Sequence, residues 1–172
     1  MAEIVWPAEF RPENTSVFAS NEITIAARPE IVWAWLIRAK TWPQWYSNAH
    51  HPVLGGGLGV DVGPNLEPGM VFRWETFGMQ LASTVREFVP KERLAWDAKG
   101  KGIEAYHAWL LEPTEAGGTR VLTQETQKGW NARLRHLFMP KALGKAHQEW
   151  LVGLKQRAEN GAPEKPVINV RV

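Results

Sequence analysis

The segment Ile23–Tyr46 constrains the fold of this 172-residue chain more than any other. Apolar side chains alternate over Ile23–Ala27, which predicts a strand with one face against a core. Pro29 suits the first turn of a helix, and residues 32–36 carry a one-sided apolar stripe. Pro43, with a tryptophan close on either side, restricts the backbone before it to extended or turn geometry. The chain is therefore expected to open with a strand, a helix and a chain reversal.

Three later stretches alternate apolar and polar residues, as strands of an antiparallel sheet do. Their inward sets are predicted to be Met70, Phe72 and Trp74, then Leu81, Ser83 and Val85, and then Leu94, Trp96 and Ala98. Pro90–Glu92 is expected to form the turn between the last two strands. The region His50–Gly69 is rich in Gly and Pro and holds only short strand candidates, at Val53–Leu54 and Val60–Val62.

A hairpin is predicted over Ile103–Gln127, because Pro113–Gly118 has the Pro and Gly residues of a turn. The turn sets the register, in which opposed residues on one face recur every second position. This register pairs Leu111 with Val121, Trp109 with Thr123, and His107 with Glu125. A histidine and a carboxylate are thus expected to meet directly across two strands.

The C-terminal part predicts a long helix that Pro140 can start and Asn160–Gly161 ends. One arc of this helix is apolar and includes a histidine: Leu143, Ala146, His147, Trp150, Leu151, Leu154 and Ala158. Upstream, Gly129–Met139 is expected to form a separate short helix. Its Trp130, Leu134, Leu137 and Phe138 are expected to cap the core, in preference to forming an interfacial anchor.

In order and spacing these segments resemble the START-like superfamily, also called SRPBCC, with its birch-pollen-allergen-type, polyketide cyclase/dehydrase and heat-shock ATPase-activator branches. The resemblance covers roughly Val17 to Ala158. It is carried by Ile25–Pro29, Val32–Leu36, Trp45, Val85–Pro90 with Arg93–Leu94, His107–Pro113, and Gly117–Val121 closing with Glu125. The resemblance implies an α+β helix-grip fold. In it, a curved antiparallel sheet of about six to seven strands wraps a long C-terminal helix, and two short helices follow the first strand.

The domain organisation follows from length and from these boundaries. Residues 1–16 are predicted to be an N-terminal arm, residues 17–160 a single START-like domain, and residues 161–172 a tail. Ten Trp residues in so short a chain supply bulky apolar area for a core or a cavity. We expect Trp6 and Phe10 to be possible anchors of the arm.

In this superfamily the space between sheet and helix implies a cavity for apolar or amphipathic ligands. The resemblance implies that the candidate residues of its wall are Phe72, Trp74, Leu81, Val85, Trp96, His107, Trp109, Thr123, Glu125, His147 and Trp150. Their aromatic members can equally be plain core. For His147, a structural role as a hydrogen-bonded core histidine is the preferred interpretation.

His107 and Glu125 are the candidate catalytic residues, because a carboxylate beside an imidazole fixes its tautomer and raises its basicity. Thr123 and Ser83 are the other polar groups that an enzyme of the cyclase type would have available here. The same two residues can instead be buried and satisfy each other's hydrogen bonds, or they can lie in contact with water at the rim of the cavity. An enzyme is therefore a less favoured hypothesis than a binding protein.

Composition excludes several classes of function. A formal net charge of +2 is too small to indicate a nucleic-acid partner. The absence of Cys excludes disulfides and thiolate sites, and His50-His51 point to opposite sides of an extended segment, so no metal and no cofactor are predicted. No stretch approaches about 18 uninterrupted apolar residues. We expect a soluble cytoplasmic protein with no stable membrane insertion.

Three classes of function stay open. The favoured one is a carrier or sensor that binds a hydrophobic or amphipathic small molecule of lipid, polyketide or aromatic type. The first alternative is a polyketide cyclase/dehydrase-like enzyme. The second alternative is a protein-binding module of the chaperone-activator type with an exposed apolar patch, whose partner the sequence does not identify.

Overall fold

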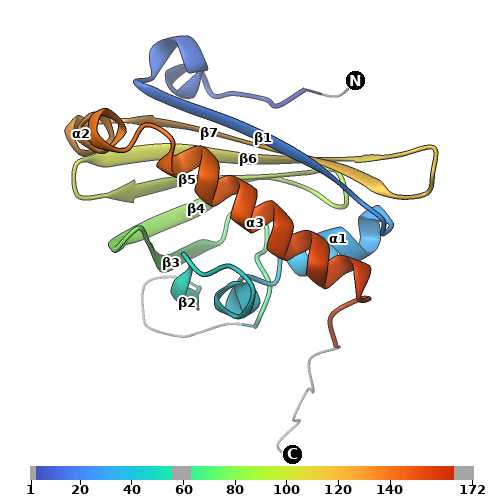
Figure 1. Cartoon of the computed structure of the whole chain (residues 1–172). Coiled ribbons are helices and arrows are strands. Elements are labelled where there is room, and N and C mark those ends of the chain that lie inside the picture. The colour runs from blue at the N-terminus through green and yellow to red at the C-terminus, as the bar shows by residue number, and fades with distance from the viewer. Residues whose placement is uncertain (1–2, 56–62, 165–172) are drawn as a thin grey trace, which may run out of the picture.

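A computed structural model describes residues 3–55 and 63–164, which form one antiparallel sheet crossed by a long helix (Figure 1). The strands are β1 Val17–Ile25, β2 His50–Leu54, β3 Val71–Thr76, β4 Met79–Val89, β5 Arg93–Gly100, β6 Ile103–Pro113 and β7 Thr119–Lys128. They lie in the order β1-β7-β6-β5-β4-β3-β2. The helices are α1 Pro29–Leu36, the 3₁₀ helix η3 Ala39–Gln44, α2 Trp130–Phe138 and α3 Ala142–Glu159. This arrangement confirms the helix-grip prediction.

Helix α3 lies across one face of the sheet, with α1 near its C-terminal end and α2 just before its start (Figure 1). The predicted apolar arc of α3 is the side that packs on the sheet, and His147 is buried among its apolar members. The helix approaches the rest of the domain closely at Gly153. A Cβ atom at this position would lie 2.2 Å from the carbonyl oxygen of Trp45.

The register of the β6–β7 hairpin is the one that the turn predicts. Leu111 pairs with Val121, Trp109 with Thr123 and His107 with Glu125, without a bulge along the whole pairing. The inward sets of β3, β4 and β5 are likewise buried, except for Met70, which is half-buried just before β3. The period of two and the turn positions therefore identified which residues share a face, and the choice of the inner face of the β6–β7 hairpin rested partly on the family resemblance.

The N-terminal arm covers the outer face of the same sheet. Its two 3₁₀ turns, η1 Ala8–Phe10 and η2 Pro12–Asn14, precede β1 (Figure 1). Phe10 is buried and stacks on Tyr106 of β6 with 5.7 Å between ring centroids, and its carbonyl oxygen accepts a hydrogen bond from Thr126 Oγ1 at 2.8 Å. The outward side chains Tyr106 and Ala108 of β6 are thus buried beneath the arm.

Some boundaries differ from the predictions. Strand β1 begins at Val17, well before Ile23, because its polar residues pair with β7 through the backbone regardless of side chain. Around Pro43 the chain forms the 3₁₀ helix η3, in place of extended or turn geometry, and the Trp42 indole N–H donates to the Leu36 carbonyl oxygen at 3.0 Å. The candidate strand Val60–Val62 lies outside the described residues.

Helix α2 is separate from α3, as predicted, but its expected role as a cap of the core is wrong. Ala132 is the buried residue of this helix, whereas its large apolar side chains are exposed. The sequence pattern identifies the residues that share a helix face, and it does not identify what that face contacts.

Candidate functional site

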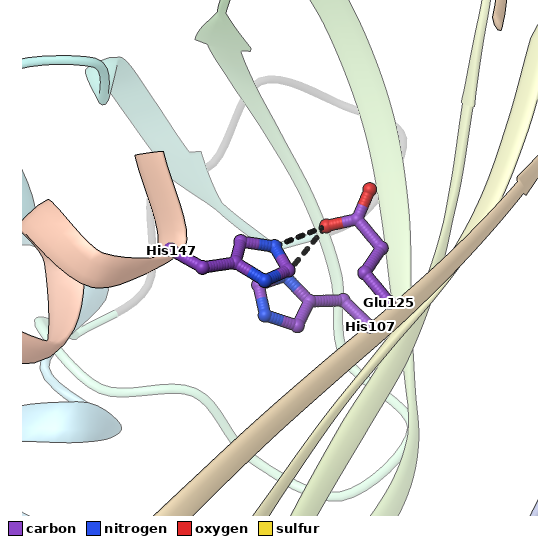
Figure 2. A group of neighbouring side chains, drawn as sticks. All are labelled: His107, Glu125 and His147. Carbon is purple, nitrogen blue, oxygen red and sulfur yellow. Dashed lines mark hydrogen bonds and ion pairs between the residues drawn. The ribbon is translucent and has the colours of Figure 1, made fainter. Parts of the chain in front are cut away.

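Three polar side chains from three elements meet between the sheet and α3 (Figure 2). His107 comes from β6, Glu125 from β7 and His147 from α3. The Oε2 atom of Glu125 lies 3.1 Å from His107 Nδ1 and 3.1 Å from His147 Nε2. All three residues are buried, so these contacts form in a low-dielectric interior.

Two neighbouring side chains hold this cluster in place. Thr123 Oγ1 lies 2.7 Å from His107 Nε2, and Gln127 Nε2 donates to Glu125 Oε1 at 2.6 Å. A carboxylate accepts hydrogen bonds and cannot donate them, so the proton of neutral His107 belongs on Nδ1, facing Glu125. Nε2 then accepts a hydrogen bond from the Thr123 hydroxyl. The tautomer of His107 is thereby set by its two partners.

Burial controls the charge of the cluster. It is the largest cause that lowers the pKa of His107 to about 3, and the attraction of Glu125 offsets it only in part. For Glu125, burial alone would raise the pKa. The neighbouring imidazoles and the hydrogen bonds from His147 and Gln127 outweigh this effect, so the pKa of Glu125 is lowered. At neutral pH the site therefore holds a carboxylate beside a neutral His107.

His147 offers an acceptor that no described residue uses. Its Nε2–H donates to Glu125 Oε2, and in this tautomer the lone pair lies on Nδ1. Nδ1 is buried and has no hydrogen-bond partner among the described residues. The same is true of the indole N–H of Trp150, one turn further along α3. A buried donor and a buried acceptor thus lie unpaired on neighbouring turns of one helix.

A pocket adjoins this cluster between α3 and the strands β3 to β7. Its wall is mainly apolar and is formed by Tyr46, Trp74, Thr76, Phe77, Met79, Leu81, Trp96, Ala98, Ile103, Ala105, His107, Glu125, Gln127, Leu143, His147 and Trp150. The space open to the centre of a water molecule is about 30 Å³. This is room for a few water molecules only, far below the few hundred Å³ of a typical small-molecule pocket.

Aromatic packing explains why the pocket is narrow. Trp42 and Trp150 touch edge to face with 5.1 Å between centroids, and Tyr46 stacks on Trp150 at 4.4 Å. Trp96 joins the same group at 5.6 Å from Trp42. Much of the aromatic area that the sequence placed on a cavity wall therefore fills the interior instead.

The predicted wall residues divide into two groups in the structure. Those beside the pocket are Trp74, Leu81, Trp96, His107, Glu125, His147 and Trp150, whereas Phe72, Val85, Trp109 and Thr123 are buried outside its lining. Ser83 accepts a hydrogen bond from the Trp74 indole at 3.1 Å and does not line the pocket either.

Sequence reasoning missed several pocket residues. Gln127 continues the inward register two positions after Glu125, so the hairpin pattern itself could have included it. Tyr46 and Phe77 had no such signal, because they come from a loop after η3 and from the β3–β4 turn. Burial is the main cause that raises the pKa of Tyr46, so its hydroxyl keeps its proton and can donate.

His107, Glu125 and His147 are also a group that could hold a metal ion. Their ligand atoms lie within 4.8 Å of one another, and two imidazoles with a carboxylate suit zinc or iron(II). The carboxylate oxygen, however, already accepts the His147 hydrogen bond. A metal would have to separate these partners, and the cluster is held by hydrogen bonds as it stands.

The comparisons with known proteins agree with this fold. A family model described as polyketide cyclase / dehydrase and lipid transport matches residues 16–159. The chain belongs to this family. The predicted START-like resemblance is thereby confirmed. A search of curated proteins found no match.

Solved structures extend the comparison. A hypothetical protein, jhp0584 from Helicobacter pylori, is 33% identical and has a TM-score of 0.83, covering 92% of this chain and 97% of that one. TTHA0849 from Thermus thermophilus is 17% identical, with a TM-score of 0.66 over 82% of this chain and 96% of that one. The di-domain ARO/CYC protein StfQ, from the steffimycin biosynthetic pathway, is 15% identical with a TM-score of 0.66. That match covers 84% of this chain and 51% of StfQ, and at this identity it concerns the fold alone.

Proposed function

We propose that the protein binds an amphipathic small molecule that carries a hydroxyl group. The apolar part would lie against the aromatic wall, and the hydroxyl would reach α3. The observation that carries this proposal is the pair of unpaired polar atoms on α3, His147 Nδ1 and the Trp150 indole N–H, both in residues that line the pocket. A hydroxyl donates one hydrogen bond and accepts others, so it can satisfy both.

Binding requires the pocket to widen. Its present space fits water, and a ligand of ring size needs several times more. Phe77, Met79 and Leu143 are half-buried pocket residues and are the side chains most easily displaced toward solvent. The buried cluster behind them would stay in place, because each of its members is held by hydrogen bonds or close contacts within the sheet and α3.

The test uses two aromatic probes of matched shape, 2-naphthol and naphthalene, with Trp fluorescence as the readout. We expect 2-naphthol to bind about tenfold more tightly, because one buried hydrogen bond contributes about 1 kcal/mol or slightly more. His147→Phe should remove this preference while naphthalene binding persists. His50→Gln, at an exposed histidine of β2 outside the pocket lining, is the control. Equal affinities of the wild type for both probes would overturn the proposal.

A cyclase- or dehydratase-type activity is the second candidate, and a specific arrangement favours it. Glu125 holds the N–H side of His147 and leaves the opposite nitrogen free, which is how a carboxylate positions an imidazole as a general base. The protonated Tyr46 hydroxyl lies in the same pocket lining and could stabilise a developing enolate oxygen. His147, not His107, is then the candidate base.

Proton exchange tests this second candidate directly. A bound aromatic ketone in D₂O should exchange the protons next to its carbonyl group faster than in buffer alone, as measured by NMR. Glu125→Gln and His147→Phe should abolish the acceleration but leave ketone binding. An exchange rate equal to that of buffer, with the ketone demonstrably bound, would exclude the base and leave a binding protein.

A further inference from the structure

Helix α2 presents its large apolar side chains to solvent. Trp130 is 61% exposed, Leu137 73% and Phe138 74%, and Leu134 and Met139 are also exposed. The four helical residues lie at positions i, i+4, i+7 and i+8, which share one face. A contiguous apolar face of this kind, with Met139 beside it, marks an interaction site more often than an accidental surface.

Polar residues that flank the apolar face fix α2 on the domain. Asn131 Nδ2 donates to the Lys101 carbonyl oxygen at 2.9 Å, and Arg133 Nε donates to Ser16 Oγ at 2.9 Å. The Arg135 guanidinium lies over the Phe77 ring, 5.3 Å from its centroid. Polar contacts beside the apolar face therefore hold it outward, and its exposure is not a consequence of a loosely attached helix.

The sequence segment that contains α2 carries only positive formal charges. Residues 126–148 hold five of the chain's 20 Lys and Arg residues and none of its 18 Asp and Glu residues, so the rest of the chain carries a net charge of −3. Lys128 and Lys145 have carboxylate neighbours in Glu104 and Glu149. Arg133, Arg135 and Lys141 have no ion-pair partner among the described residues. An apolar face bordered by cations complements an anionic lipid surface.

The pocket opens beside α2. A surface groove lined in part by Arg135, His136 and Met139 shares Phe77, Met79, Ile103, Gln127 and Leu143 with the wall of the inner pocket. The segment that joins α2 to α3 thus borders the outer end of the space that leads to His147. Figure 1 places α2 just before the start of α3, at the end of the sheet away from α1.

We propose that α2 docks on the surface of an anionic phospholipid bilayer, with its apolar face in the headgroup region and Arg133, Arg135 and Lys141 against lipid phosphates. None of the helices in the described part of the chain is long and apolar enough to cross a membrane, so the contact is peripheral. The docked orientation turns the pocket mouth toward the lipid. The inferred ligand source is therefore the bilayer itself, a step that rests on the proposed small-molecule binding, whereas the docking does not.

Flotation with lipid vesicles tests the docking. The full chain should bind vesicles of equimolar phosphatidylcholine and phosphatidylglycerol, and binding should weaken in high salt. Replacing Leu137 and Phe138 together by Ser should reduce the partition coefficient at least about tenfold, because two apolar side chains no longer enter the interface. Lys141→Glu should reduce it at least about fivefold, the effect of about 1 kcal/mol per cation.

Matched controls lie elsewhere on the surface. Val152→Ser alters an exposed apolar residue on the outer side of α3, and Lys91→Glu reverses an exposed cation at the β4–β5 turn, near α1. Both should bind vesicles like the wild type. Three results would overturn the proposal: no binding to anionic vesicles, equal binding to pure phosphatidylcholine, or self-association in solution that the Leu137/Phe138 variant loses.

The membrane-docking proposal and the small-molecule proposal can be refuted independently of each other. The Leu137/Phe138 variant should still bind 2-naphthol added from solution, since neither residue lines the pocket, but should take up a vesicle-borne ligand more slowly. If instead 2-naphthol never binds while flotation behaves as expected, the docking stands and the proposed small-molecule function is wrong.

Discussion

Acid should destabilise this protein through protonation of His107, and a comparison with a variant that lacks this histidine can separate its contribution from those of other groups. His107 has an unfolded-state pKa of 6.5, and burial lowers the folded-state pKa to about 3. Between these values the unfolded chain binds a proton at His107 and the folded chain does not, so stability falls as pH falls. Lowering the pH from about 7 to about 4.5 should then cost about 2.5 kcal/mol through this residue.

The pH window separates His107 from Glu125. The folded-state pKa of Glu125 is lowered, so its contribution is present above its unfolded-state value of 4.5 and is lost as pH falls through the folded-state pKa. Protonation of Glu125 therefore changes the stability of the protein mainly below about pH 4.5. Other groups contribute within the window, so the quantity to measure is the difference between wild type and a variant.

Urea unfolding of wild type and His107→Gln across this window provides the measurement. Gln keeps a donor and an acceptor for Glu125 and Thr123 but does not titrate, so the variant should lose about 2.5 kcal/mol less than the wild type between about pH 7 and about pH 4.5. His136→Gln, at an exposed histidine, should follow the wild type. If His107→Gln and wild type lose stability in parallel, His107 is protonated in the folded state and the reasoning fails.

Three other predictions concern packing and metal. Gly153→Ala places a methyl group 2.2 Å from the Trp45 carbonyl oxygen and should cost about 1–3 kcal/mol of unfolding free energy, whereas Gly144→Ala, in the same helix with its nearest heavy atom 3.7 Å away, should not be destabilising. Phe10→Ala should cost about 3 kcal/mol and expose Tyr106 to collisional quenchers, and protection of Tyr106 in the variant would contradict the packing of the arm. Dialysis against EDTA should leave 2-naphthol affinity and thermal midpoint unchanged, and stoichiometric zinc or iron in the purified protein would reassign the His107, Glu125 and His147 cluster.

The sheet was predictable because the side chains of a strand alternate between only two faces. In the β6–β7 hairpin the turn fixes the register, and a one-residue slip would move His107 and Glu125 to the other face together with every apolar neighbour. The buried arc of α3 was equally predictable, since residues three and four apart share a face whatever lies opposite. Local periodicity is therefore enough to predict which residues share one face of a strand or a helix.

The site required information that periodicity does not contain. The pairing of His107 with Glu125 was expected, but the approach of His147 depends on how far along α3 the helix crosses the sheet. Its assignment as a core histidine described its burial and missed its free nitrogen. Likewise, the stripe on α2 was visible in the sequence, although its orientation depends on contacts made by Asn131 and Arg133, which border it.

The position of the polar cluster also determines how the molecule can move. His107 and Glu125 lie within two long strands that each pair on both sides, so their amide protons should exchange with solvent only through global unfolding. Phe77 lies in a tight turn and Met139 in a short connection between helices, where amides should exchange through local opening. Hydrogen exchange should thus divide the molecule into a slow interior that contains His107 and Glu125 and a fast border that contains Phe77 and Met139, beside the pocket.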